Sequence, residues 1–505
     1  MLERCLCAAL AGMLAWAIPA AAQEADEAWP QFRGPHATGM ATVAGAPPIE
    51  FGPTKNLLWK TPLPPGHSSP AVWRNRIFLT AVDADSRTLE TIALDRANGR
   101  IVWRHAITVP QLEHLHVLGN AATATPAVDG ERVYVYFGSY GVIAYYLDGG
   151  TAWQVPMPVL QNGFGSGTSP VVSDNLLIIN RQEPKDPFIV ALDRKTGKEI
   201  WKHNYEIPAG LPGPYASYST PLIAGHDVIV HGMTRLEAFD LESGQSKWWV
   251  RINSTGTSSP LLAGDRIYVA SWSPFGETDQ MGVLPDYPTL LKNDRNGNGT
   301  ISRDEIPDSL KVFSRPEAPD VPGATYSVNA AFARFDANKD GELQKEEWEA
   351  GLKYIASLTF QHGLIAVRPG GSGDVTATHV IWKENTAIPE VPTPVVYQNR
   401  IYMIRNGGIL SCMDAATGTL VYRTRVGAPG PYYSSPVVAN GHLIVASGDG
   451  VVSVLGTGDR LDVLAKNDLD EAIMATPAVV GSVLYIRTAS GLFAFSQTHE
   501  STARR

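Results

Sequence analysis

Short apolar segments with the character of β-strands recur along the chain, and each follows the same step. A small residue and then a proline precede these segments at Pro70, Pro126, Pro170, Pro221, Pro260, Pro394, Pro436 and Pro477. The steps lie about 40 to 55 residues apart, as in four-stranded propeller blades, except for one long gap after Pro260. Apolar and polar positions alternate incompletely, which is typical of strands buried on both faces. The pattern predicts an all-β protein built from a repeated four-stranded sheet.

A hairpin signature follows the third strand of several repeats. An aspartate precedes a glycine by four residues and an aromatic residue follows it by four, in Asp95-Gly99-Trp103, Asp193-Gly197-Trp201, Asp240-Gly244-Trp248 and Asp414-Gly418-Tyr422. The glycine suits a positive-φ position in a short hairpin loop, and the aromatic side chain can fill the wedge between neighbouring sheets. The signature therefore predicts sheets that pack against one another.

The two ends of the chain complete one repeat between them. Three strands at most follow Pro477, ending near Phe495, whereas residues 57–63 form a lone outer strand that carries Trp59. Pairing the two fragments would close a ring and remove open sheet edges. We therefore expect an eight-bladed β-propeller of four-stranded W-shaped sheets with a small α-helical insertion.

The insertion falls inside the fifth repeat, which is interrupted after Trp272 and resumes at residues 363–367 and 379–383. Two twelve-residue loops in the gap, DRNGNGTISRDE at 294–305 and DANKDGELQKEE at 336–347, place oxygen-bearing residues at alternate positions. Such a loop wraps about six to eight oxygens around one hard cation, with glycine at the sharp sixth position. The expected calcium ligands are Asp294, Asn296, Asn298, the Thr300 carbonyl, Ser302 and Glu305 in the first loop, and Asp336, Asn338, Asp340, the Glu342 carbonyl, Gln344 through a water molecule and Glu347 in the second.

The residues around the loops refine this prediction. Ile301 and Leu343 occupy the same apolar position in each loop and can face each other in a short two-stranded contact. Apolar residues at helical spacing predict helices at 326–335 and 345–355, while Pro307 requires the helix after the first loop to be short or to start late. The alternative interpretation is a pair of ordinary polar turns. Because the second loop offers three carboxylates and the first offers two, we expect tighter calcium binding at the second.

The repeat resembles that of the quinoprotein-like propeller family, and WPQFRGP at 29–35 resembles the opening segment of its secreted members. Residues 285–356 resemble a pair of EF-hands. The resemblance implies eight blades, as in the quinoprotein alcohol dehydrogenases and in a propeller lipoprotein of outer-membrane protein assembly. It also implies that the dehydrogenases hold pyrroloquinoline quinone (PQQ) under a ring of vicinal cysteines. The cysteines here are Cys5, Cys7 and Cys412, so PQQ is not an expected cofactor.

The amino terminus predicts export. Residues 1–22 combine Arg4, an apolar stretch and small residues at a cleavage position, as in a signal peptide. Cys412 would then be the one mature cysteine, and its apolar surroundings favour a buried, inert thiol. A net charge of −9 disfavours nucleic-acid binding, and no later stretch is apolar enough for a transmembrane helix. We expect a periplasmic or secreted protein, monomeric, with a signal peptide (1–22), an extension (23–56), the propeller (57–284 and 357–497), the insertion (285–356) and a tail (498–505).

The loops that lead into the first strand of each blade should converge on one end of the axis and line a funnel. They carry His67, His114, His116, Tyr215, Tyr218, Tyr432 and Tyr433. A ligand site there competes with ordinary turn and packing roles for the same residue types. Because no acid–base or nucleophile set is recognisable, we favour a non-catalytic scaffold that binds an envelope protein or a polysaccharide. The alternative is a PQQ-dependent or other oxidoreductase with its site in the funnel.

Overall fold

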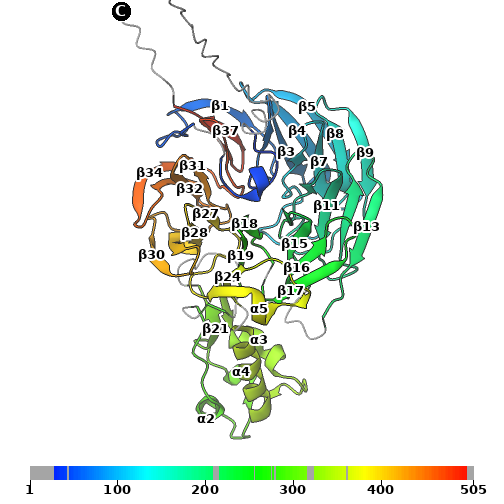
Figure 1. Cartoon of the computed structure of the whole chain (residues 1–505). Coiled ribbons are helices and arrows are strands. Elements are labelled where there is room, and N and C mark those ends of the chain that lie inside the picture. Colours follow the sequence, from blue (N-terminus) through cyan, green and yellow to red (C-terminus); the bar gives the residue numbers. More distant parts are fainter. Residues whose placement is uncertain are drawn as a thin grey trace, which may run out of the picture.

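The computed structural model describes residues 28–41, 45–208, 215–254, 256–273, 276–277, 280–315, 324–359 and 362–497. Within them, seven four-stranded sheets and one five-stranded sheet surround a common axis, and two two-stranded sheets lie outside this ring (Figure 1). The predicted eight-bladed β-propeller is confirmed. The predicted signal peptide and the tail at 498–505 lie outside the described residues.

Each blade fills from the strand nearest the axis outward. Blades one to four contain β2 (Ala71–Trp73), β3 (Arg76–Asp83), β4 (Thr88–Asp95) and β5 (Ile101–Thr108); β6 (Ala127–Val128), β7 (Arg132–Phe137), β8 (Gly141–Tyr146) and β9 (Thr151–Pro156); β10 (Val171–Val172), β11 (Leu176–Arg181), β12 (Phe188–Asp193) and β13 (Glu199–Asn204); and β14 (Leu222–Ala224), β15 (Asp227–His231), β16 (Arg235–Asp240) and β17 (Ser246–Arg251). Blades five to seven contain β18 (Leu261–Ala263), β19 (Arg266–Ser271), β24 (Gly363–Val367) and β26 (Val380–Glu384); β27 (Val395–Tyr397), β28 (Arg400–Arg405), β29 (Ile409–Asp414) and β30 (Leu420–Arg425); and β31 (Val437–Ala439), β32 (His442–Ala446), β33 (Val451–Gly456) and β34 (Asp462–Asp468).

Blade eight joins the two ends of the chain, as predicted. Its inner strands β35 (Ala478–Val480), β36 (Val483–Arg487) and β37 (Gly491–Phe495) are completed by β1 (Leu57–Pro62), which pairs antiparallel with β37. Arg487 reinforces the closure from β36, since its Nη1 donates to Ser68 Oγ and to Thr80 O, both at 2.6 Å, in blade one. Its side chain is buried, and burial lowers its pKa to about 9, so it remains charged at neutral pH.

A closed ring of hydrogen bonds links all eight blades near the axis. In every blade the residue before the recurring proline is serine or threonine, and its backbone N–H donates to the hydroxyl of its counterpart in the next blade at 2.9 to 3.0 Å. The ring runs through Ser69, Thr125, Ser169, Thr220, Ser259, Thr393, Ser435 and Thr476 and returns to Ser69. All eight residues are buried. The small-residue-and-proline step of the sequence therefore encodes contacts between blades as well as the start of each inner strand.

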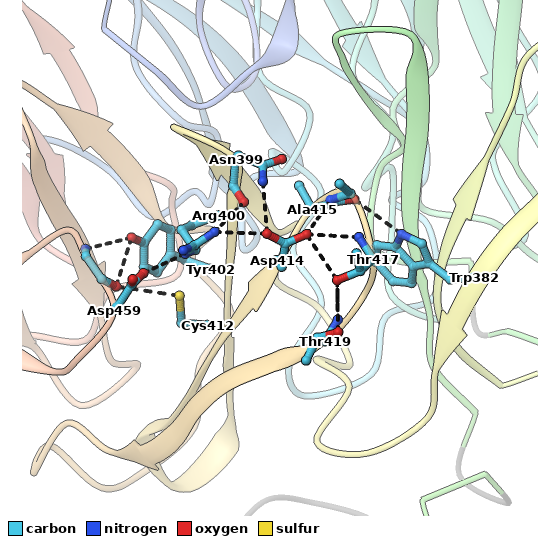
Figure 2. A network of polar contacts seen from close by, with 12 residues as sticks. Trp382, Asn399, Arg400, Tyr402, Cys412, Asp414, Ala415, Thr417, Thr419 and Asp459 are labelled. Atoms are coloured by element: carbon cyan, nitrogen blue, oxygen red, sulfur yellow. Dashed lines mark hydrogen bonds and ion pairs between the residues drawn. The ribbon is translucent and has the colours of Figure 1, made fainter.

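The hairpin signature encodes the contacts farther from the axis, as Figure 2 shows for blade six. Asp414 Oδ1 accepts the backbone N–H of Thr417 at 2.9 Å, which shapes the turn. Trp382, in the outer strand of blade five, donates from Nε1 to Ala415 O at 3.2 Å. Gly418 has φ +74°, and a Cβ atom there would lie 2.6 Å from the Trp382 ring, so glycine permits the close approach. Cys412 lies in β29, the strand that ends at Asp414, and is fully buried. Burial raises the pKa of its thiol to about 11, as expected for an inert cysteine.

The amino-terminal segment 28–41 crosses the axis. Trp29 pairs with Val72 in blade one, and Met40 pairs with Val438 in blade seven. Between them Arg33, fully buried, donates from Nη1 to Thr393 O at 2.9 Å and from Nη2 to Pro394 O at 2.7 Å in blade six. This segment therefore ties distant blades together across the centre.

The insertion lies between β19 and β24 and extends beyond the edge of the disc (Figure 1). It contains α2 (Tyr287–Leu290), η2 (Leu291–Asn293), β20 (Ile301–Ser302), η3 (Arg303–Glu305), β21 (Lys311–Ser314), β22 (Thr325–Ser327), α3 (Val328–Phe335), β23 (Glu342–Leu343) and α4 (Lys345–Thr359). Its apolar residues form a core cluster of their own, which includes Val328, Phe332 and Phe335 of α3 and Trp348 of α4.

Two helices in the insertion can be compared with the prediction. The predicted start of a helix at residue 326 is wrong: residues 325–327 pair with β21, and Ser327 accepts the Ala330 N–H at 3.1 Å as the N-cap of α3. The helix at the end of the first loop, η3, is only three residues long, as Pro307 required. A further feature was not predicted: β25 (Gly373–Asp374), followed by α5 (Thr376–His379), adds a fifth, parallel strand to the outer edge of blade four.

Candidate metal centre and funnel rim

The two twelve-residue loops of the insertion lie side by side. β20 and β23 pair antiparallel, with Ile301 opposite Leu343, and both side chains are fully buried. The predicted contact between these residues is confirmed. Thr300 Oγ1 also donates to Glu342 Oε2 at 2.9 Å, so the residues at the seventh position of each loop are joined by their side chains.

The loops share one hydrogen-bonding frame. In the first, Asp294 Oδ2 accepts the Gly299 N–H at 2.9 Å, and in the second Asp336 Oδ2 accepts the Gly341 N–H at 3.1 Å. Both glycines have positive φ, +84° and +87°, at the sharp sixth position. The carboxylate of the first residue therefore turns into each loop, as a first ligand would.

The last residue of each loop reaches back across it in the same way. Glu305 Oε1 accepts the Arg295 N–H at 2.9 Å, and Glu347 Oε1 accepts the Ala337 N–H at 2.9 Å. Backbone N–H groups of Ser302 and Arg295 lower the pKa of Glu305 to about 2, so this carboxylate is ionised at neutral pH. The last glutamate of each loop is thus held by backbone N–H groups from the start of the same loop.

The second loop contains one buried oxygen with no hydrogen-bond partner among the described residues, Asp336 Oδ1. The Asp336 side chain is only 7 % exposed. An unpaired buried carboxylate oxygen is costly, and native structures satisfy such atoms with water or a cation. The other predicted ligands of this loop are engaged: Asn338 Oδ1 accepts the Asp340 N–H at 2.8 Å, and Gln344 Nε2 donates to Asp340 Oδ2 at 2.8 Å.

The donor set fits a hard cation better than a transition metal. No group of three or more His, Cys, Asp and Glu side chains is placed to hold a metal among the residues described. The loops instead combine carboxylates with amide, hydroxyl and backbone carbonyl oxygens, which are the ligands of calcium. Calcium would compete with the internal hydrogen bonds of Asp340 and Glu347 for their carboxylates.

The funnel and the insertion lie at the same end of the axis. Strands alternate in direction within a blade, so the β19–β24 connection and the loops that enter the inner strands share one end. Of the predicted funnel residues, Tyr215 and Tyr432 are buried packing residues, and Tyr432 donates to Ala428 O at 2.8 Å. His67 is half-buried, and burial together with Arg487 lowers its pKa to about 4.

An exposed aromatic cluster remains in the funnel. The rings of His116 and Phe164 lie 4.8 Å apart, and those of Phe164 and Tyr218 lie 5.6 Å apart with an edge-on geometry. Phe164 is 45 % exposed and the neighbouring Val117 is 79 % exposed. His114 is also exposed, but the described residues place it in no metal-binding group. Tyr433 lies half-buried in the loop before blade seven.

Sequence reasoning missed two buried carboxylates beneath the funnel loops. Glu113, 4 % exposed, accepts hydrogen bonds from the Ser139 hydroxyl and from the Ser166 N–H at 3.3 Å, and so joins three loops. Burial raises its pKa to about 7, against the opposing hydrogen bonds from Ser139 and Ser166. Its only signal in the sequence is a carboxylate among turn residues next to His114.

The second missed carboxylate is Glu277, fully buried where the insertion leaves the propeller. It accepts hydrogen bonds from His362 Nε2 and Arg405 Nη1, both at 3.0 Å, and from the Ile388 N–H at 2.6 Å. His362 Nδ1 accepts the Ser273 N–H at 2.9 Å, so Nε2 carries the proton that it donates to Glu277. These contacts join residues far apart in the sequence, which is why no local pattern indicated them.

Comparison with known proteins gives one family. The family model described as outer membrane protein assembly factor BamB matches residues 50–281 and 335–501. The curated relative BamB of Yersinia pestis is 24 % identical over 439 residues, which cover 82 % of this chain and 92 % of that protein. The family match leaves out residues 282–334, which contain the first twelve-residue loop.

Solved structures share the fold. BamB from Moraxella catarrhalis has 13 % identity and a TM-score of 0.52 over 88 % of this chain and 99 % of that chain. The quinohemoprotein alcohol dehydrogenase ADHIIG from Pseudomonas putida HK5 has 13 % identity and a TM-score of 0.55 over 96 % of this chain and 83 % of that one. The computationally designed Ika8 protein has 9 % identity and a TM-score of 0.52, covering 88 % of this chain and 100 % of the designed one. At such identities the likeness shows the fold alone. Among the described helices, none has the length and apolar character needed to cross a membrane.

Proposed function

Because this chain belongs to the family of outer membrane protein assembly factor BamB, we propose that it is a calcium-binding, non-catalytic propeller scaffold of the cell envelope that binds another protein. The family and the Yersinia pestis relative carry the name of an assembly factor, which supports a protein partner. An exported location rests on the signal-like residues 1–22. A polysaccharide ligand is the other outcome that the experiments below distinguish.

The calcium part of the proposal rests on Asp336 Oδ1, which has no hydrogen-bond partner among the described residues. The other expected ligand positions of the same loop also offer oxygen atoms. Asp336, Asn338, Asp340, the Glu342 carbonyl, Gln344 and Glu347 would hold one ion, and the matching residues from Asp294 to Glu305 would hold the other. A bound ion supplies positive charge that offsets the repulsion between converging carboxylates. The chain's own contribution is the paired strands β20 and β23, which fix both loops on one small core.

Titration calorimetry of the mature protein tests the metal sites. We expect two bound calcium ions with dissociation constants of about 10⁻⁴ to 10⁻³ M, in the range of extracellular modules. Glu347→Gln should weaken binding more than Glu305→Gln, because the second loop has the higher carboxylate count. Lys353→Gln, an exposed change on α4 outside the loops, is the matched control and should leave binding unchanged. Equal losses in the two glutamate variants would contradict the ranking, and no heat of binding would contradict the assignment.

The partner surface that we assign is the funnel end, where Val117 and Phe164 are exposed on neighbouring loops. A photo-crosslinking amino acid at Val117 should capture a protein from the cell envelope. The same amino acid at Leu58, which is 47 % exposed on the outer strand β1, is the control and should not. Capture from both positions, or of carbohydrate only, would argue against a protein partner at this end.

A further inference from the structure

The β21–β22 hairpin connects both calcium loops to the propeller. β21 follows the first loop six residues after Glu305, whereas β22 runs directly into α3, whose last residue precedes Asp336. The Val328 N–H donates to Leu310 O at 3.0 Å, so the start of α3 is fixed to the residue before β21. The hairpin is therefore a covalent and hydrogen-bonded route from both loops towards the disc.

The far end of the hairpin is anchored on the funnel rim through Arg315. Its backbone N–H donates to Ala324 O at 2.7 Å, and its Nη1 bonds Glu390 Oε2 at 2.7 Å. The guanidinium also lies 4.6 Å from the centre of the Trp272 ring in blade five. Arg315 is 6 % exposed, whereas the Glu390 side chain is 25 % exposed, so the ion pair is partly shielded from water.

Glu390 belongs to the loop between blades five and six, at the funnel end of the axis. Its charge reaches the neighbouring funnel loop: burial raises the pKa of Tyr433, Glu390 and Asp449 raise it further, and Arg315 lowers it. The charges of the Arg315–Glu390 contact therefore act on Tyr433, which is one of the predicted funnel residues.

A second attachment of the insertion does not involve the calcium loops. Glu277 and His362 lie at its two chain ends and bond each other, and Glu277 also accepts from Arg405 of blade six and from the Ile388 N–H in the loop between blades five and six. This root is fully buried and contains no residue of either loop or of the hairpin. The root therefore holds the insertion on the propeller. The hairpin is bonded to the adjoining segment, since the Gly282 N–H donates to Val312 O at 2.9 Å and the Ser314 N–H donates to Gln280 O at 2.8 Å.

We propose that calcium binding in the insertion orders the funnel rim between blades five and six through the β21–β22 hairpin and the Arg315–Glu390 contact, and so makes partner binding at the funnel calcium-dependent. This inference rests on the proposed function, since it requires calcium in the loops. Without calcium, repulsion among the loop carboxylates loosens α3 and β21, and the Arg315 anchor loses its fixed position. With calcium, the hairpin is rigid and holds Glu390 in place.

Hydrogen–deuterium exchange of the mature protein, with calcium alone or with chelator, tests the proposal. In the wild type, saturating calcium should slow exchange of peptides covering residues 309–315 and 385–394 by at least about threefold. Arg315→Gln and Glu390→Gln should bind calcium with unchanged affinity in calorimetry, yet lose the calcium effect at 385–394 and keep it in α3. Lys353→Gln removes one charge from the insertion without touching the rim and should behave as the wild type.

The outcomes separate this inference from the proposed function. Two calcium ions bound by the wild type with no change at 385–394 would overturn the coupling and leave the calcium sites standing. Protection at 385–394 that persists in both Arg315→Gln and Glu390→Gln would overturn the route through Arg315. Failure of the wild type to bind calcium would remove both proposals.

Discussion

The propeller and the insertion of this chain are stabilised in different ways. The propeller repeats its contacts: the ring of backbone-to-hydroxyl bonds passes through all eight blades, and tryptophan–glycine contacts recur between several pairs of neighbouring blades. The insertion has one small apolar cluster, and its two loops are joined by the two-residue strands β20 and β23. Repetition makes the propeller tolerant of local loss, whereas the insertion depends on a few charged loops.

The two regions also treat buried charge differently. In the propeller, Arg33 and Arg487 are buried against neutral carbonyl and hydroxyl oxygens, where they fasten segments that are distant in sequence. In the insertion, Asp336 Oδ1 is left without a hydrogen-bond partner among the residues described. The buried arginines of the propeller are thus matched by acceptors within the chain, whereas this buried carboxylate oxygen of the insertion has no such match among the described residues. The following predictions test that contrast.

The largest effect should come from removing the clamp at the ring closure. Arg487→Ala leaves a cavity and removes the charged donor to Ser68 Oγ and Thr80 O, which should reduce the free energy of unfolding of the propeller by about 4 kcal/mol. Urea unfolding measures the loss, and Arg487→Lys, which keeps the charge but not the fork, should lose less. Calcium affinity of the insertion should not change. A loss below about 1 kcal/mol would show that strand pairing alone closes the ring.

The next effect is a pH dependence located in the propeller. The pKa of Glu113 rises from 4.5 to about 7 in the folded protein, so its contribution to stability is fully present below pH 4.5 and is lost as pH rises through 7. The loss amounts to about 3 kcal/mol by the pKa difference. Unfolding free energies at pH 5 and pH 8 should therefore differ more for the wild type than for Glu113→Gln, which cannot ionise. Parallel pH profiles for the two proteins would contradict a buried, proton-binding Glu113.

The sequence predicted the structural features that recur from blade to blade and those that depend on residues within a single loop. Proline spacing and the Asp-Gly-Trp signature were sufficient for the blade count and the closure of the ring by β1, because these contacts recur at fixed positions. The pairing of Ile301 with Leu343 followed from matching positions in two similar loops. The calcium ligands themselves stay a prediction.

The unpredicted features all depend on contacts between distant residues. Glu277 meets Arg405 across 128 positions, and Arg315 meets Glu390 across 75. A single buried carboxylate or arginine leaves no periodic pattern in the sequence. Its partner comes close only when the chain is folded, because the two residues are far apart in the sequence. The start of α3 was misplaced for a related reason, because residues 325–327 pair with β21 instead of extending the helix.

Calcium removal should loosen the insertion and leave the propeller folded. At calcium concentrations about 100 times the dissociation constant, one site stabilises its own unit by about 2.7 kcal/mol. Chelator should therefore increase hydrogen exchange across α3, α4 and the paired strands β20 and β23, with a further effect at the rim peptide 385–394. Exchange in the inner strands of blades one to four should stay the same. Global loss of protection would show that the insertion is an integral part of the ring, and would contradict the conclusion that the two regions are stabilised in different ways.

The smallest effect expected is none at all, on addition of PQQ to the propeller. A bound quinone needs a surface on each face and cations for its three carboxylates. The chain has no adjacent cysteines, and the arginines near the funnel already have partners: Arg181 bonds Glu183, Arg405 bonds Glu277, and Arg487 bonds Ser68 and Thr80. Both predicted calcium loops lie in the insertion, away from the axis where such a cofactor would sit.

We expect no stoichiometric quinone spectrum and no dye-linked oxidation of alcohols or aldoses after incubation with PQQ and calcium, measured beside a quinoprotein dehydrogenase as the positive control. A bound-quinone spectrum that fades in Tyr218→Ala or Tyr433→Ala, but not in Glu347→Gln, would place a catalytic site in the funnel and reverse the assignment of the propeller as a scaffold.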